Sequence, residues 1–346
     1  MRDKLKILAK ILIPVLIGVG VVVWLFGREF DISSLRSITL GDTTVPGIIL
    51  AFLALAIRQL AMAWRFRALT DRRLRWLPAT KVTFLCDFTS AITPTSVGGS
   101  VLSMIFLSRE GIHPGRATAI TMTTLFLDEL YMVVMCPLLF LFMSANQLFG
   151  FSSDAAATDL EITFWIVYAI LCGVTVALFV GLFFSPHLIA NALKKLFSLP
   201  ILRRWRKNID ELGDNLIATS RELHHKNIKW WGEALLSTFV LWTFRFLIVN
   251  ALFFAFYPEA DQLTIFGRQF VVWALLIFTP TPGGSGVSEM LFKTYYADII
   301  GGPLLMVLAI SWRILTYYIY LLAGIGLIPT FLKSEKQKND RSHNIS

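Results

Sequence analysis

The stretch Thr279–Glu289, TPTPGGSGVSE, governs the expected fold of this chain, and an imperfect copy of it, TPTSVGGSVLS, lies upstream at Thr93–Ser103. Each copy follows an apolar run, 82–92 in the first case and 270–278 in the second. Proline and glycine both interrupt a helix, because proline lacks a backbone donor and glycine allows unusual dihedrals. Non-helical backbone at membrane depth is tolerated only where it is buried in protein or lines a cavity. The two stretches therefore predict a site.

The composition is that of an integral membrane protein, because 55% of the 346 residues are hydrophobic and only 16% are charged. Apolar runs of about 18 residues or more are long enough to span a membrane. We expect six spans, at about 7–26, 46–66, 117–143, 161–184, 230–256 and 303–328. The net charge of +9 lies in loops beside these runs, which indicates orientation in the membrane and argues against nucleic-acid binding.

The three cysteines, Cys86, Cys136 and Cys172, all fall inside apolar runs and have no metal-ligand spacing. We interpret them as buried small hydrophobic residues, and we expect no disulfide framework, no metal and no cofactor. The chain also lacks a GxxxxGK motif, so any energy for its activity would come from an ion gradient or a lipid gradient.

Loop charges set the orientation of the first broken segment, 82–107. The loop 65–81 carries six Lys or Arg against one Asp, 144–161 carries no Lys or Arg, and 185–229 carries nine against four acids. Positive residues favour the cytoplasmic side. All three loops fit if 82–107 enters and leaves the membrane on the cytoplasmic side. We therefore predict a re-entrant hairpin with its turn at TPTSVGG.

The second broken segment, 268–299, is predicted to be the mirror image of the first. The loop before it carries two acids and one Arg, which suits the outside, and the tail 333–346 carries four Lys or Arg, which suits the cytoplasm. Residues 46–149 and 230–330 then each consist of a span, a hairpin and a span, and they begin on opposite sides. This is an inverted-topology repeat, an arrangement that many secondary transporters use. The alternative is that two similar Pro-Gly turns arose independently.

We therefore expect a single all-α polytopic membrane domain over 1–332, with both termini in the cytoplasm. The linker 185–229 mixes apolar and basic residues, which suits either a helix lying in the membrane interface or a solvated linker helix. The tail 333–346 is predicted to be disordered.

Ionisable side chains at membrane depth are costly and mark function by default. The candidates are Arg58, Asp87, Asp128, Glu129, Arg245, Glu289, Lys293 and Arg313. Arg313 is the strongest of them, because long apolar runs flank it on both sides. It either binds a ligand or forms an ion pair, with Glu129 or Glu289, that only joins the two halves.

The carboxylates allow more than one role. Asp87 lies on the entering arm of the first hairpin, and it either couples proton movement, as Asp128 and Glu129 also could, or accepts hydrogen bonds from the hairpin. Glu289 falls in the first turn of the expected returning helix, where a carboxylate favours the positive end of the helix dipole. That capping role is sufficient for Glu289, and ligand binding is the alternative.

Three further arginines lie close to the expected membrane interfaces. Arg65 and Arg67 end the span 46–66, and Arg109 ends the segment 82–107. We expect these side chains to contact water or lipid phosphates.

Small residues open the returning arm of each hairpin: Gly98, Gly99 and Ser100 in the first, and Gly283, Gly284 and Ser285 in the second. Free N–H groups at a helix start bind anions, and small residues permit close approach. With Arg58, Arg245 and Arg313 on the surrounding spans, the pattern predicts a cavity for a negatively charged group such as a phosphate. The alternative is that the glycines only let helices pack closely in lipid.

Four motifs resemble the lysylphosphatidylglycerol synthase transmembrane, or flippase-like, domain family. They are TPTSVGGSVLSMIFLSREGI at 93–112, LDELYMV at 127–133, TPTPGGSGVSE at 279–289 and SWRILTYY at 311–318. The last two, in that order and spacing, are the most specific, and the resemblance covers roughly 10–330. It implies a membrane domain that moves anionic or aminoacylated phospholipids, or polyprenyl-linked lipids, between leaflets. The residues that fall on motif positions are Gly98, Gly99, Glu129, Pro282, Gly283, Gly284, Glu289 and Arg313.

The chain departs from the family pattern at one position. Many relatives carry an acidic residue directly after the first Gly-Gly, where this chain has Ser100. A carboxylate role at that position, and with it the family's substrate preference, does not carry over. No aminoacyltransferase domain follows residue 330, so we do not expect the chain to aminoacylate lipid.

These patterns predict a lipid transporter of the flippase or scramblase type in the cytoplasmic (inner) membrane of a prokaryote, without enzymatic activity. The headgroup of an anionic phospholipid or a polyprenyl-phosphate lipid would lie between the hairpin tips, with its tails in the membrane. One alternative is an intramembrane enzyme acting on a lipid phosphate, with Asp87 or Glu129 as its base; no His, Cys or metal cluster is expected beside the site. The other alternative is a small-anion secondary transporter. A lipid-synthesising enzyme is a candidate partner, and the chain is a candidate homo-oligomer.

Overall fold

The computed structural model describes residues 41–93, 98–150, 155–185, 226–277 and 281–324, and in addition residues 187, 191, 223, 279, 326 and 327. The expected span 7–26, most of the linker 185–229 and the tail 333–346 therefore lie outside the described residues. Every regular element within the described ranges is a helix.

Five helices in the described part of the chain are long and apolar enough to cross a membrane. They are α3 (Thr44–Leu69), α6 (Pro114–Phe142), α8 (Ala155–Phe183), α11 (Ile228–Phe256) and the helix Gly302–Gly324, whose first part is α14 (Gly302–Arg313). These bounds agree with the corresponding expected spans to within a few residues. The expected class, an all-α polytopic membrane protein, is confirmed.

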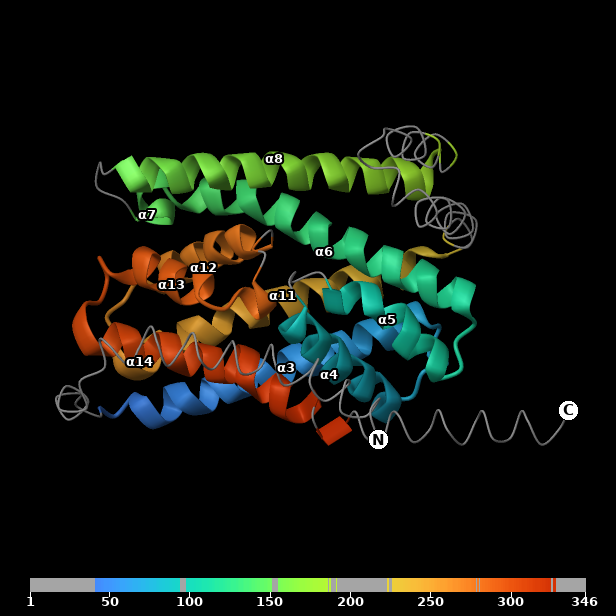
Figure 1. Cartoon of the computed structure of the whole chain (residues 1–346), viewed down its shortest axis with the longest axis horizontal. Coiled ribbons are helices and arrows are strands. Elements are labelled where there is room, and N and C mark those ends of the chain that lie inside the picture. The colour runs from blue at the N-terminus through green and yellow to red at the C-terminus, as the bar shows by residue number, and fades with distance from the viewer. Residues whose placement is uncertain are drawn as a thin grey trace, which may run out of the picture.

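Two pairs of short helices occupy the two broken segments. The first pair is α4 (Trp76–Ile92) with α5 (Gly98–Arg109), and the second is α12 (Gln262–Leu276) with α13 (Val287–Tyr296). The two members of each pair contact each other. The first pair lies at the right-hand end of the bundle in Figure 1, and the second lies at the left-hand end. They are called the first and the second hairpin below.

Each hairpin begins and ends at one end of the bundle. Asp71, just after α3, pairs with Arg116 in the first turn of α6, so the two spans that flank the first hairpin meet there. At the opposite end, Arg268 in the middle of α12 pairs with Asp298, which follows α13, at 2.5 Å. Arg268 also donates to the carbonyl of Gln147, which follows the far end of α6, at 2.9 Å. The hairpins thus reach into the bundle from opposite ends, as an inverted repeat requires. Which end faces the cytoplasm stays a prediction.

The helices that open the two predicted repeats, α3 and α11, pack against each other along their length and run in opposite directions. Arg72, just after α3, pairs with Glu233 near the start of α11 at 2.9 Å. At the other end, Gly47 lies directly against Ala255, and a side-chain carbon on Gly47 would fall 2.6 Å from the backbone nitrogen of Ala255. Small residues let helix backbones approach closely in membranes. This contact holds α3 and α11 together, and the first helix of each hairpin packs against one of them.

The break in the second hairpin follows from its glycines. A single 3-10 turn covers Pro282–Gly284, and Gly283 and Gly284 have positive φ angles of 56° and 70°. Residues with a side chain rarely adopt such angles, so glycine is required there. The returning helix α13 then begins at Val287. The expectation that Gly283, Gly284 and Ser285 open this helix was therefore wrong: they form the turn that precedes it.

The last span contains a π-helical turn, Ile314–Tyr318, that begins directly after Arg313. Turns of this kind are rare and frequently occur at functional sites. The wider turn changes which residues share a helix face. Arg313, Tyr317 and Tyr320 all border the cavity described below.

Candidate functional site

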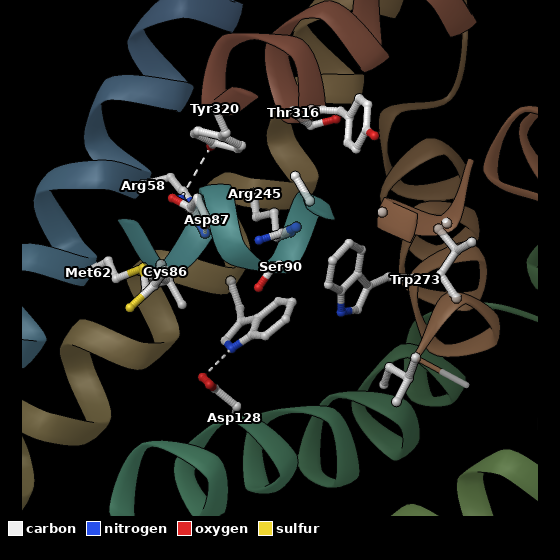
Figure 2. A pocket seen from close by; sticks show the side chains of 18 of the residues that line it. Arg58, Met62, Cys86, Asp87, Ser90, Asp128, Arg245, Trp273, Thr316 and Tyr320 are labelled. Atoms are coloured by element: carbon white, nitrogen blue, oxygen red, sulfur yellow. Dashed lines mark hydrogen bonds and ion pairs between the residues drawn. The ribbon is translucent and has the colours of Figure 1, made fainter. Parts of the chain in front are cut away.

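A cavity of about 130 Å³ lies where the tips of the two hairpins meet. Across the tips, the Gly283 N–H donates to the carbonyl of Thr93 at 3.4 Å, which is long for a hydrogen bond. Side chains from α3, α4, α6, α11, α12 and α14 line the cavity, and Figure 2 shows most of them from close by. The charged residues among them are Arg58, Arg65, Asp87, Asp128, Glu129, Arg245 and Arg313.

A buried ion pair between Asp87 and Arg58 ties the first hairpin to α3. The Arg58 Nη2 donates to Asp87 Oδ1 at 2.7 Å, and its Nη1 donates to Oδ2, so the pair is bidentate. Nη1 also contacts the side chain of Gln59 and the hydroxyl of Tyr320, the latter at 3.3 Å. Bidentate pairs combine strength with a fixed geometry. Of the two roles expected for Asp87, the acceptor role is present, with its donor on α3 and not on the hairpin.

Arg65 is buried and paired, so the prediction that it contacts water or lipid phosphates was wrong. Its guanidinium pairs with Asp128 on α6 and lies 3.5 Å from the hydroxyl of Thr238. Asp128 also accepts a hydrogen bond from Trp242 Nε1 at 2.7 Å. Arg65 lies on the inward face of its helix, and nearness to a span end does not reveal which face a residue occupies.

Arg313 is buried against the tip of the second hairpin. Its Nε lies 2.8 Å from Glu289 Oε1, its Nη1 donates to the Gly283 carbonyl at 3.2 Å, and its Nη2 donates to the Ser285 hydroxyl at 3.3 Å. The guanidinium carbon also lies 4.2 Å from the centre of the Tyr317 ring. Of the two carboxylates expected to pair with Arg313, Glu289 is the one that does. Both residues belong to the second half of the chain, 230–330, so the pair ties a span to a hairpin and does not join the two halves as expected. Arg313 also borders the cavity.

Glu289 has a second role at the start of α13. Its Oε2 accepts hydrogen bonds from the Gly286 N–H at 2.7 Å and from the Ser288 hydroxyl at 2.9 Å. The capping role expected for Glu289 is therefore confirmed. Since this carboxylate already meets the positive end of the helix dipole, the start of α13 offers little attraction to a second anion.

Arg245 makes no ion pair and no hydrogen bond with any residue in the described part of the chain. Its guanidinium carbon lies 3.8 Å from the centre of the Trp273 ring and 5.4 Å from that of Trp242. Such contacts stabilise the cation, but they leave its five N–H donors without acceptors. Figure 2 shows the Arg245 side chain near the centre of the lining residues. A negatively charged ligand would supply the missing acceptors.

Glu129 also lacks an ion pair and a hydrogen bond to the described residues, and its Oε2 is buried without a partner. It borders the cavity from α6, one residue after Asp128. The sequence allowed Arg313 to pair with either Glu129 or Glu289. The pair with Glu129 is not formed, because Arg313 pairs with Glu289. Glu129 is therefore left facing the cavity without a counter-ion.

The two arms of the first hairpin pack closely against each other where α5 begins. The Gly99 N–H donates to the hydroxyl of Ser90 on α4 at 3.1 Å. A side-chain carbon on Gly99 would overlap the carbonyl of Cys86, so this glycine permits the close packing of the two arms. Gly98 and Ser100 flank it in the first turn of α5. Gly99 therefore lets the two helices pack closely, which was the alternative to anion binding. Anion binding by Gly98 and Ser100 stays a prediction.

Three more candidates lie away from the cavity. The Arg67 Nε donates to the Leu74 carbonyl at 3.1 Å, and its guanidinium lies 4.2 Å from the centre of the Trp76 ring, so this group meets protein where water or lipid was expected. Arg109 is half-buried at the end of α5. Lys293 is exposed on α13 and does not line the cavity.

Aromatic residues form much of the lining, and sequence reasoning missed them. They are Trp242, Trp273, Trp312, Tyr317 and Tyr320. Aromatic residues occur throughout the spans, so no spacing distinguishes the ones that meet an arginine. Cys86 also lines the cavity, which corrects the expectation that no cysteine lies beside the site. Within the described residues, no group of three or more His, Cys, Asp and Glu could hold a metal ion.

The fold and the site define a multi-pass α-helical membrane protein with two opposed hairpins and a charged, aromatic-lined cavity between their tips. The family model described as the lysylphosphatidylglycerol synthase TM region matches residues 11–324, and the chain belongs to this family. It is also similar to a UPF0104 membrane protein of Archaeoglobus fulgidus, with 23% identity over 304 residues that cover 84% of this chain and 89% of the relative. No solved structure matches the chain. The family membership fits a membrane role related to lipids.

Proposed function

We propose that this protein is a lipid transporter of the flippase or scramblase type that moves an anionic, phosphate-bearing lipid between leaflets. The observation that carries the proposal is Arg245, an arginine at membrane depth that lines the cavity between the hairpin tips and has no acceptor among the described residues. A charged residue inside a membrane domain is expensive unless it pairs or serves a substrate path. An anionic headgroup gives Arg245 its missing partner.

The size of the cavity favours a headgroup over a whole lipid. Its volume of about 130 Å³ holds several water molecules or one small polar group, but no acyl chains. The outer faces of the spans are apolar; Leu53, Ile166 and Val176, for example, are 51%, 56% and 61% exposed. The acyl chains of a bound lipid would lie along such surfaces, in the membrane, while the headgroup occupies the cavity.

The arrangement of the hairpins suggests how the cavity opens. Each hairpin is fixed to a long span by an ion pair. Among the described residues, one long hydrogen bond, from Gly283 to Thr93, joins the two tips, and a small apolar cluster packs Phe88 and Ala91 of α4 against Tyr317 and Leu321 of the last span. Movement of one repeat against the other would separate the tips and expose the headgroup to alternate leaflets.

The loop charges favour an orientation in which the end of the bundle near Asp71 faces the cytoplasm of a prokaryotic cell, and the surrounding membrane is the inner membrane. A lipid-synthesising enzyme as partner and a homo-oligomer stay predictions.

The test is leaflet redistribution of fluorescent phosphatidylglycerol in vesicles that contain the purified protein. The wild type should move the lipid faster than empty vesicles do. Arg245→Gln should reduce the rate about tenfold to a hundredfold, which corresponds to the loss of charge-assisted hydrogen bonds of about 1.5–3 kcal/mol. Arg72→Gln is the matched control, because the Arg72 side chain is 66% exposed and lies outside the cavity; its rate should equal that of the wild type.

Two results would contradict the proposal. Wild-type protein that moves lipid no faster than empty vesicles, with or without a pH gradient, removes the transport function. A full rate in Arg245→Gln removes the role of this residue. Uptake of inorganic phosphate without lipid movement would instead favour the small-anion transporter, and turnover of a lipid phosphate would favour the intramembrane enzyme.

A further inference from the structure

The charges that line the cavity pair off, with two exceptions. The pairs are Arg58 with Asp87, Arg65 with Asp128, and Arg313 with Glu289. Each pair contributes no net charge to the site. The two groups that remain are Arg245 and Glu129, which have no counter-ion among the described residues.

The two unpaired groups balance each other while the cavity holds no ligand, because ionised Glu129 offsets the charge of Arg245. An anionic headgroup at Arg245 adds one negative charge to this site at membrane depth. Uncompensated charge in a low-dielectric interior is strongly unfavourable. The balance is restored if Glu129 takes up one proton, since the cavity then holds one cation, one anion and a neutral carboxylic acid.

We propose that Glu129 is the proton-binding site of the cavity and that it takes up one proton for each anionic headgroup that binds at Arg245. The inference rests on the proposed function, because it requires an anion at Arg245. The proton comes from water at the open end of the cavity and leaves with the headgroup at the other end. Each transport step then carries one proton and one singly charged lipid, and it moves no net charge across the membrane.

Among the titratable groups that line the cavity, Glu129 is the one that can take up a proton when an anion binds. Asp87 and Asp128, the other carboxylates of the lining, are each held by an arginine. The other titratable side chains of the lining are the thiol of Cys86 on α4 and the phenols of Tyr317 and Tyr320 in the last span after α14, and none of them is a carboxylate. The helix α12 adds only uncharged residues to the lining.

Two further helices, α5 and α8, pack against α6 away from the cavity. The charged group of α5 is Arg109, at its far end. On α8, Tyr168 and Cys172 lie beside Cys136 of α6, and the Tyr168 hydroxyl donates to the Val133 carbonyl at 3.0 Å. Neither helix supplies a carboxylate to the lining, so Glu129 carries the proton.

The test measures the binding of a short-chain phosphatidylglycerol, whose phosphodiester stays ionised, to the purified full-length protein from about pH 5 to about pH 9. Wild-type affinity should fall with rising pH, by up to about tenfold per pH unit, because deprotonation of Glu129 opposes the bound anion. Glu129→Gln should bind with the low-pH affinity at every pH, since its side chain stays neutral. Glu110→Gln, an exposed position at the end of α5, is the control and should keep the wild-type slope.

Calorimetry in two buffers with different heats of ionisation measures the proton directly. Wild-type protein should take up close to one proton per lipid above the titration range, and Glu129→Gln should take up none. Lipid binding that is independent of pH in the wild type, or an unchanged slope in Glu129→Gln, overturns this inference and leaves the role of Arg245 intact. Absence of binding at every pH, in the wild type and in Arg245→Gln alike, overturns both.

Discussion

The two hairpins share an outline but are held in different ways. The first is tied by its entering helix, since Asp87 on α4 pairs with Arg58 on the preceding span. The second is tied by its returning helix, since Glu289 on α13 pairs with Arg313 on the following span. Each hairpin is thus fixed to a neighbouring span. Among the described residues, one long hydrogen bond joins the two tips, and Phe88 and Ala91 of the first hairpin pack against Tyr317 and Leu321 of the last span. Each ion pair therefore holds its hairpin independently of the contact between the tips.

The difference between the hairpins lies in what each carboxylate does besides pairing. Glu289 also caps α13 through Gly286 and Ser288, so it supports the shape of the second tip itself. Asp87 holds only Arg58, and that arginine has Gln59 and Tyr320 as further acceptors. The second hairpin should therefore depend more on its ion pair than the first.

Removing the two carboxylates in turn tests this dependence and should give the largest effect. Glu289→Gln leaves the buried Arg313 unpaired and weakens the helix cap, and it should lower the free energy of unfolding by about 3–5 kcal/mol. Asp87→Asn should cost less, about 1.5–3 kcal/mol, because Arg58 keeps other acceptors. The measurement is thermal or denaturant unfolding of the purified protein in one detergent.

The control for this prediction is the double variant Glu289→Gln with Arg313→Gln. It should be more stable than Glu289→Gln alone, because no buried charge is left without a partner. An equal loss in the two single variants, or a larger loss in Asp87→Asn, would contradict the difference between the hairpins.

A smaller effect is expected from the turn of the second hairpin. Gly283→Ala places a side chain at a φ of 56° and against the Tyr317 ring, so it should cost about 1–3 kcal/mol. Gly232→Ala on α11 is the matched control, because no atom lies within 4 Å of the added carbon and alanine favours a helix by up to about 1 kcal/mol. Unfolding curves of the two variants should move in opposite directions. A neutral Gly283→Ala variant would show that the tip adopts another conformation.

The smallest effect concerns the end of the bundle where the first hairpin begins and ends. Burial acts to raise the pKa of Asp71, but hydrogen bonds from Lys226 and Arg116 hold that pKa below its ordinary value of 3.8. A lowered pKa stabilises the folded state above the ordinary value, and this contribution is lost as the pH falls through the lowered value. Because the Asp71 side chain is 41% exposed, the contribution should be below about 1 kcal/mol.

Comparison of wild type with Asp71→Asn isolates that contribution. Between about pH 5 and about pH 2, the wild type should lose slightly more free energy of unfolding than the variant, which lacks the titrating group. Identical pH dependence in the two proteins would mean that the cluster at this end does not stabilise the fold.

The hairpins could be predicted from the sequence because their signal is local. Pro and Gly inside long apolar runs mark the breaks, and the expected segments 82–107 and 268–299 coincide with α4–α5 and α12–α13 to within several residues. The ionisable residues at membrane depth were also informative, since most of them line one cavity. Charge is rare in a membrane span, so its positions identify a site without knowledge of the fold.

The partners within the site could not be predicted, because they depend on how each helix is rotated. Lipid is as apolar as the interior, so a span carries little pattern that tells its buried face from its outer face. The sequence therefore left two carboxylates for Arg313, assigned Arg65 to the interface, and gave no reason to select Trp242 and Trp273 as the neighbours of Arg245. These choices follow from the contact between α3 and α11 and from the π-helical turn after Arg313.

The central claim is that an anionic headgroup occupies the cavity between the two tips, against Arg245. The most direct measurement is an electron cryomicroscopy map of the protein in lipid discs that contain phosphatidylglycerol, recorded for the wild type and for Arg245→Gln. We expect phosphate density within hydrogen-bond distance of the Arg245 guanidinium in the wild type and its loss in the variant. Headgroup density confined to the outer surface, with the same cavity contents in both proteins, would contradict it.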